Sequence, residues 1–75
     1  MTDPRIYVRI ADDLRRQIAD GTLRPGTPVP SITTLSQEHG TARQTAAKAL
    51  RLLESEGLVV RIQGLGYYVT QIGSE

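Results

Sequence analysis

The sequence predicts a mainly α-helical fold that is closed by a small antiparallel β-hairpin. Three stretches carry apolar residues at helical spacing, and glycines separate these stretches. After Gly57 the apolar period changes from about 3.6 to about 2, which indicates strands. A chain of 75 residues can build one small core. We therefore expect a single domain over residues 1–75, with an ordered core from about residue 5 to about residue 70.

The first helix is expected to follow Asp3 and Pro4, which form a helix-start signal, while Met1–Arg5 is expected to be frayed. Its apolar residues follow an i, i+3, i+4, i+7, i+11 pattern: Tyr7, Ile10, Ala11, Leu14 and Ile18. We assign Tyr7 to the core rather than to a ligand site, because an aromatic residue in such a stripe is normally buried. The helix is expected to end by Gly21.

The segment Gly21–Pro30 is rich in turn residues and is expected to connect the first two helices. Pro25 and Gly26 favour a turn of type II geometry. Leu23 and Val29 are its apolar anchors. A short strand at residues 27–29 is a further option.

The stretch Ser31–Gly57 predicts two helices joined by a tight glycine turn. Ser31 can cap the first of them, and its apolar residues Ile32 and Leu35 lie three positions apart. Gly40 can end it in the left-handed conformation. Thr41, followed three residues later by Gln44, matches a capping box and predicts a second helix over about Ala42–Glu56.

The second helix of this pair has one apolar face, formed by Ala42, Ala46, Ala49, Leu50 and Leu53. The opposite face carries Arg43, Gln44, Ala47, Lys48 and Arg51. Two helices around a short glycine turn, with long hydrogen-bond donors at the start of the second, are the helix-turn-helix arrangement of DNA-binding proteins.

A hairpin is expected beyond Gly57, with strands at Leu58–Ile62 and Tyr67–Thr70 around the loop Gln63–Gly66. Three helices followed by such a hairpin make a winged helix-turn-helix, and the loop is then the wing. The two loop glycines either allow close approach to a phosphate or serve only the turn, and the sequence leaves both readings open.

The charge of the chain is nearly balanced, with nine Lys and Arg against eight Asp and Glu and a net charge of +1. The sequence therefore carries no overall basic signature of nucleic-acid binding. The positions of the charged residues are more informative, because elements that can share one surface contain four basic residues: Arg43, Lys48, Arg51 and Arg61.

The chain has no Cys and a single His39, which excludes disulfides and cysteine-bearing zinc sites. It shows no paired carboxylates in a cleft, no Ser-His-Asp set and no phosphate-binding glycine loop followed by Lys. We expect no catalytic residues, no metal and no cofactor. No stretch predicts a membrane span or a signal peptide, so a cytoplasmic location is expected.

Three motifs occur in order: IADDLRRQIADGTLRPGTPVPS, LSQEHGTARQTAAKALRLLESEGLV and QGLGYYV. From about Tyr7 to Val69 the chain resembles the N-terminal DNA-binding domain of the GntR family of bacterial transcription regulators. The resemblance implies a recognition helix in the major groove of duplex DNA and a wing at the minor groove or backbone. By this resemblance Arg43, Gln44, Thr45, Gln63 and Gly64 contact DNA. The full set of DNA-binding residues that we expect is Thr33, Thr41, Arg43, Gln44, Thr45, Lys48, Arg51, Gln63, Gly64, Leu65 and Gly66.

Within this set, Arg43 can bond guanine O6 and N7, and Gln44 can bond adenine N6 and N7. The resemblance implies a phosphate contact for Thr45. A capping box would instead turn the Gln44 side chain back to the backbone of Thr41. Lys48 and Arg51 either approach phosphates or form a solvated helix face.

The chain departs from the family pattern at four positions where polar or basic residues are usual. Thr33 stands for an Arg, Ala42 for a Ser or Thr, Ala47 for a second Arg and Leu65 for a basic wing residue. Fewer phosphate contacts predict a modest affinity and a shallow salt dependence.

We therefore expect sequence-specific binding of duplex DNA by a bacterial transcriptional regulator, with repression as its mode. A homodimer on adjacent half-sites is expected, and no small-molecule effector is expected to bind this domain. Whether the chain is an excised domain or a stand-alone protein stays open. The alternative is a winged-helix protein-interaction module without DNA binding, which the near-neutral charge and an exposed Leu65 would suit.

Overall fold

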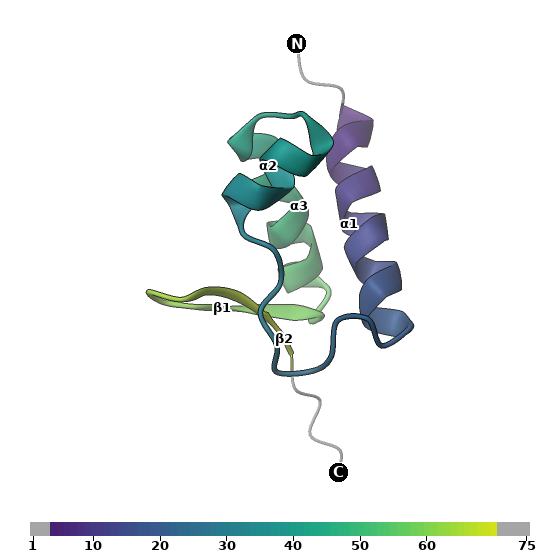
Figure 1. The fold of residues 1–75 in the computed structure, drawn as a ribbon, viewed down its shortest axis with the longest axis vertical. Coiled ribbons are helices and arrows are strands. Elements are labelled where there is room, and N and C mark those ends of the chain that lie inside the picture. Colours follow the sequence, from purple (N-terminus) through teal and green to yellow (C-terminus); the bar gives the residue numbers. More distant parts are fainter. Residues whose placement is uncertain (1–3, 71–75) are drawn as a thin grey trace.

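The computed structural model describes residues 4–70 and contains three helices followed by a two-stranded hairpin. The elements are α1 (Pro4–Ala19), α2 (Ile32–His39), α3 (Arg43–Ser55), β1 (Val59–Ile62) and β2 (Gly66–Val69). In Figure 1, α1 and α3 lie side by side, α2 lies beside the upper part of α3, and the hairpin lies below α2. This confirms the predicted fold class. None of these helices combines the length and the apolar character that a membrane crossing requires.

The start of α1 differs from the prediction in part. Pro4 and Arg5 already belong to the helix, so the predicted fraying is wrong for these two residues, because Pro fits the first helical turn without losing a hydrogen bond. The other residues of that prediction, 1–3, lie outside the described part.

The core is formed where the apolar stripe of α1 packs against α3. This helix packing is more extensive than that between α2 and α3. Ile10, Ala11 and Leu14 of the predicted stripe are buried, while Tyr7 and Ile18 are partly buried against the same cluster. The remaining buried apolar residues come from every other element: Val29, Leu35, Ala46, Ala49, Leu50, Leu53, Val59 and Val69. The placement of Tyr7 in the core is confirmed to that extent.

The connector begins with the predicted turn at Pro25 and Gly26. Gly26 has φ of 84°, which type II geometry requires, and the N–H of Thr27 donates to the carbonyl of Arg24 at 3.1 Å. Three backbone hydrogen bonds of 2.8 to 3.0 Å then join residues 26–29 to β2. The predicted short strand is reduced to a single bridge between Pro28 and Tyr68, because Pro lacks the N–H that a ladder needs.

Both predicted caps of α2 are present. The Ser31 hydroxyl accepts a hydrogen bond from the Thr34 N–H at 3.0 Å, and Gly40 ends the helix at φ 62° and ψ 39°. The N–H of Thr41 then donates to the carbonyl of Ser36 at 3.0 Å, which completes the termination of α2.

The predicted capping box at the start of α3 is wrong. Thr41 is used in ending α2, so the N-cap falls on Ala42, which has extended backbone angles and no side-chain cap. Gln44 is then the second helical residue rather than the third, the position from which a capping glutamine reaches back. The Gln44 side chain is therefore exposed and available for other partners.

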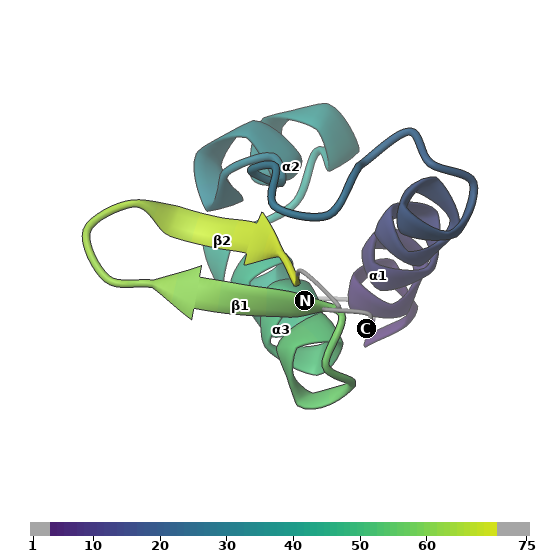
Figure 2. The ribbon, with the colours of Figure 1, turned by 90° about the horizontal axis from the view of Figure 1, so that it is seen from below.

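The hairpin pairs Val59 with Val69 at its base and Ile62 with Gly66 at its tip. β1 begins one residue later than predicted and ends at Ile62 as predicted, whereas β2 is shifted by one residue towards the loop and begins at Gly66. Val59 and Val69 are buried, whereas Val60 and Ile62 are about two-fifths exposed. Figure 2 shows the loop end of the hairpin extending beyond the helices, as a wing does.

Candidate nucleic-acid interface

The exposed face of α3 has its long polar side chains near the start of the helix. The helix buries Thr45, Ala46, Ala49, Leu50 and Leu53, and this face packs in the core. Arg43, Gln44, Lys48 and Arg51 are exposed, and Ala47 is half-buried among them. The first turn of α3 therefore presents a guanidinium and an amide to solvent.

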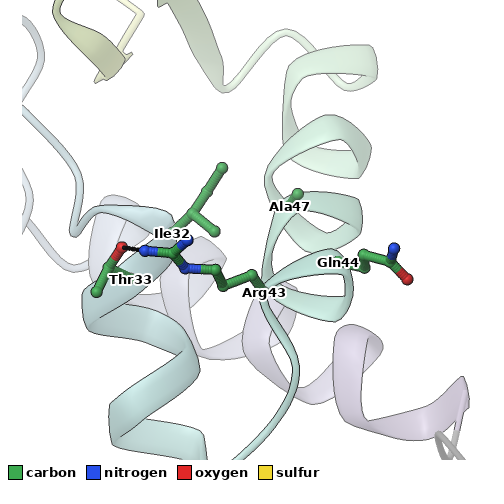
Figure 3. A pocket seen from close by; sticks show the side chains of 5 residues that line it. All are labelled: Ile32, Thr33, Arg43, Gln44 and Ala47. Carbon is green, nitrogen blue, oxygen red and sulfur yellow. Dashed lines mark hydrogen bonds between the residues drawn. The ribbon is translucent and has the colours of Figure 1, made fainter.

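Arg43 reaches from α3 to α2. Its Nη2 donates a hydrogen bond to the Thr33 hydroxyl at 3.0 Å, and both residues are exposed. Figure 3 shows the guanidinium extended towards α2, while the Gln44 side chain points to the opposite side. Thr33 therefore holds the Arg43 side chain in this direction.

A shallow hollow of about 450 Å³ lies between α2 and the start of α3. It is lined by Ile32, Thr33, Arg43, Gln44 and Ala47. Ile32 was predicted only as an apolar residue of the first helix of the pair, and its part in this surface was missed. Ala47 could have indicated this hollow from the sequence. Its short side chain, at a position where the family usually has Arg, leaves space beside α2.

A second hollow, of about 370 Å³, lies between the start of α2 and the hairpin. Its lining includes Arg61, Gly64 and Gly66 from the hairpin and again Ile32 and Thr33. The two hollows share these α2 residues, so the start of α3, the start of α2 and the wing border one continuous surface.

The tip of the wing is fully accessible. The residues of the predicted wing contact, Gln63, Gly64, Leu65 and Gly66, are all exposed, and Leu65 is 68% exposed. Gly64 and Gly66 have φ of 83° and 109°. These angles show that the loop conformation itself requires both glycines.

Three of the residues predicted to contact DNA are less accessible than the others or are engaged within the protein. Thr45 is only 6% exposed, because it belongs to the buried side of α3, so its predicted phosphate contact has almost no accessible surface. Thr41 is half-buried in the turn. Lys48 lies at the α1 edge of the polar face, where its Nζ is 4.4 Å from the centre of the Tyr7 ring. This cation–π contact joins α3 to α1.

Several acidic groups are paired with α1 arginines. Arg15 makes two hydrogen bonds of 3.0 and 2.9 Å with Glu56 and also contacts Asp12, while Arg16 pairs with Asp13 at 2.7 Å. The Glu56 hydrogen bond is the main cause of a raised pKa for Arg15. These contacts gather at α1 and the end of α3, away from the first turn of α3.

The described residues hold no group of three or more His, Cys, Asp or Glu side chains that could bind a metal ion.

Comparison with known proteins identifies the family. The model of the bacterial regulatory proteins of the gntR family matches residues 6–69. The chain belongs to the GntR family. This confirms the resemblance found in the sequence.

Two GntR-type relatives are named repressors. The mannosyl-D-glycerate transport/metabolism system repressor MngR of Escherichia coli (strain K12) is 42% identical over 66 residues, which cover 88% of this chain and 28% of MngR. The transcriptional repressor NagR of Bacillus subtilis (strain 168) is 38% identical, over 88% of this chain and 27% of NagR. The chain thus spans little more than a quarter of the length of these relatives.

Solved structures show the same fold. The DNA-binding domain of AraR in complex with its operator ORX1 matches with a TM-score of 0.83 at 30% identity, over 93% of this chain and 82% of that chain. YtrA from Sulfolobus acidocaldarius, a GntR-family transcription factor, matches with a TM-score of 0.81 at 36% identity, over 92% of this chain and 59% of that chain. The predicted winged helix-turn-helix architecture is thereby confirmed.

Proposed function

We propose that this GntR-family domain binds duplex DNA in a sequence-specific manner and is the DNA-reading part of a bacterial transcriptional repressor that acts in the cytoplasm. The AraR complex with operator DNA and the repressor names of MngR and NagR support this function. The observation that carries it is the first turn of α3, where Arg43 and Gln44 are exposed while the other side of the helix lies in the core.

In this proposal α3 enters the major groove, which is wide enough for one helix. Arg43 donates two hydrogen bonds to a guanine, and Gln44 makes the corresponding pair with an adenine. Thr33 keeps the Arg43 guanidinium extended before DNA arrives, which lowers the entropic cost of that contact.

Phosphates are contacted around these base contacts. Arg51 lies two turns further along the same face of α3 as Arg43 and approaches the backbone at the groove edge. Gln63, Gly64 and Gly66 place the wing along the backbone or the minor groove, with Leu65 at its tip. Lys48 supplies a phosphate contact only by leaving the Tyr7 ring, and Thr41 offers little surface. We leave Thr45 out of the contact set because it is buried.

Two copies of the domain are proposed to bind adjacent half-sites, since one small domain makes few phosphate contacts and pairing doubles them. A small-molecule effector, where one acts, is proposed to bind outside this domain. The supporting fact is that MngR and NagR extend well beyond the matched region.

The experiment starts from a pool of random duplexes, from which tight binders are selected and sequenced. The best duplex and a scrambled control are then titrated into labelled protein at two salt concentrations, and amide chemical shifts are followed. We expect the largest shifts at residues 41–51 and 63–66, with weaker binding to the scrambled duplex. Absence of any binding at low salt would contradict the proposal.

The second candidate function is a protein-interaction module. It is favoured by the apolar side chains that the hairpin leaves exposed: Val60 at 40%, Ile62 at 39% and Leu65 at 68%. Shifts confined to α1, or no response to any duplex, would support this alternative instead.

A further inference from the structure

We infer that the hollow between α2 and α3 binds the C5-methyl group of a thymine, and that Ile32 and Ala47 thereby determine which base pair the domain prefers. This inference rests on the proposed function and deepens it. It concerns the site lined by Ile32, Thr33, Arg43, Gln44 and Ala47.

Two of the residues that line the hollow, Ile32 and Ala47, are apolar. Ile32 is half-buried at the start of α2, and Ala47 is half-buried on α3, one turn after Arg43. In Figure 3 these two side chains lie on opposite sides of the gap between the helices, with the Arg43 stem crossing it. A polar group placed between them would lose hydrogen bonds to water, whereas a methyl group would gain contact.

The polar groups at the rim are mainly donors, and this chemistry favours thymine over the other bases. Thymine is the base whose edge in the major groove carries a methyl group, and its O4 acceptor lies next to that methyl. The Arg43 guanidinium has five N–H donors, so one that is not used for Thr33 or for a guanine can donate to O4. Cytosine would instead present its N4–H₂ donor to the guanidinium, which is unfavourable.

The hydrogen bond between Arg43 and Thr33 keeps the hollow open. With its Nη2 held by the Thr33 hydroxyl at 3.0 Å, the guanidinium sits at the α2 side instead of folding over Ala47. The Thr33 hydroxyl thus orients the guanidinium, and Thr33 itself lines the hollow.

The test uses the duplex selected from random sequences. Each thymine is replaced singly by deoxyuridine, which removes only the C5-methyl group, and affinities are measured by fluorescence anisotropy. We expect one thymine of each half-site at which the replacement weakens binding by about fourfold, the effect of burying one methyl group. Replacing the same pair by 5-methylcytosine with guanine is expected to weaken binding further than uracil does.

The variant Ala47→Gln fills the hollow with a polar side chain and keeps a good helix former. We expect its uracil and thymine duplexes to bind with equal affinity. The matched control is Arg51→Gln on the same helix, which should weaken binding to both duplexes and keep the fourfold ratio. Circular dichroism checks that both variants fold, and the thymine replacement in the unaltered protein needs no variant.

The outcomes separate the inference from the function. No binding to any selected duplex would overturn the proposed function and the inference with it. Tight binding that is indifferent to every thymine replacement would overturn the inference alone. A fourfold ratio that persists in Ala47→Gln would show that the methyl is read elsewhere, and 5-methylcytosine binding as tightly as thymine would overturn the assignment to thymine.

Discussion

Replacing Arg43 by Ala tests the central contact of the proposed interface. Arg43 is the exposed first residue of α3, and its side chain donates a hydrogen bond to the hydroxyl of Thr33, which is also exposed. The substitution removes no core contact, so the free energy of unfolding should change by no more than about 0.5 kcal/mol. A loss of binding can therefore be assigned to the interface and not to the fold.

The magnitude follows from the contact proposed. A bidentate bond from Arg to a guanine contributes about 1–3 kcal/mol of discrimination, which corresponds to a loss of affinity of about 5-fold to 150-fold. The variant should also lose its preference for guanine at one base pair. If Arg43 contacted a phosphate instead, affinity would fall about equally for all sequences and the salt slope would decrease by about 0.9.

The assay is fluorescence anisotropy over a series of salt concentrations, with the selected duplex and with each of its single base-pair substitutions. Arg51→Ala is the matched control, because it removes the same side chain from the same helix two turns later. We expect Arg51→Ala to reduce the salt slope without changing base preference. An Arg43→Ala protein with unchanged affinity and unchanged base preference would refute the assignment of Arg43 to a base.

Four further changes test the fold around this surface. Ala42→Ser supplies the missing N-cap of α3 and should stabilise the protein by about 1 kcal/mol in urea unfolding, whereas an unchanged midpoint would argue against Ala42 as the cap. Gly40→Ala places a Cβ at φ 62° and should destabilise by about 1–2 kcal/mol, seen as a lower thermal midpoint. Lys48→Met should lower the free energy of unfolding by about 0.5–1 kcal/mol, because it removes the cation–π interaction with Tyr7. The same substitution in a Tyr7→Leu protein should leave the free energy of unfolding unchanged. Hydrogen bonds from the side chain and the backbone N–H of Thr22 lower the pKa of Asp20 below its usual 3.8. The ionised Asp20 therefore stabilises the fold above pH 3.8, and this stabilisation is lost as the pH falls through the lowered pKa. Asp20→Asn should therefore be less stable than the unaltered protein at neutral pH and equally stable in strong acid, as measured by urea unfolding.

The sequence predicted best the features that depend on neighbouring residues. The cap at Ser31, the left-handed Gly40 and the turn at Gly26 each involve groups within three residues, so the residue type alone determines the conformation. The capping box failed because Thr41 suits two roles. Its backbone N–H completes the end of α2 by bonding to Ser36, which moves the start of α3 to the next residue.

The features that were missed need the tertiary arrangement. Lys48 contacts Tyr7 because α3 packs against α1, and nothing in either stretch alone specifies that pairing. The hollow beside Ala47 likewise exists because α2 brings Ile32 to its edge. Helical periodicity placed Ala47 on the polar face of α3 but gave no information on the opposite wall.

The near-neutral charge of the chain fits a DNA-binding surface once the positions of the charges are considered. In α3 the basic residues Arg43, Lys48 and Arg51 all precede the acidic Glu54, and the first two lie in the N-terminal half of the helix, at the positive end of its dipole. Glu56, just after the helix, is neutralised by Arg15 of α1. The domain therefore offers a small positive surface on a molecule of low net charge. Long-range attraction to DNA is then weak, and a larger share of the binding free energy must come from contacts with base edges. If the domain binds DNA as proposed, contacts with base edges therefore decide its choice of sequence more than its affinity for DNA in general, and the apolar hollow beside Ala47 can contribute to that choice.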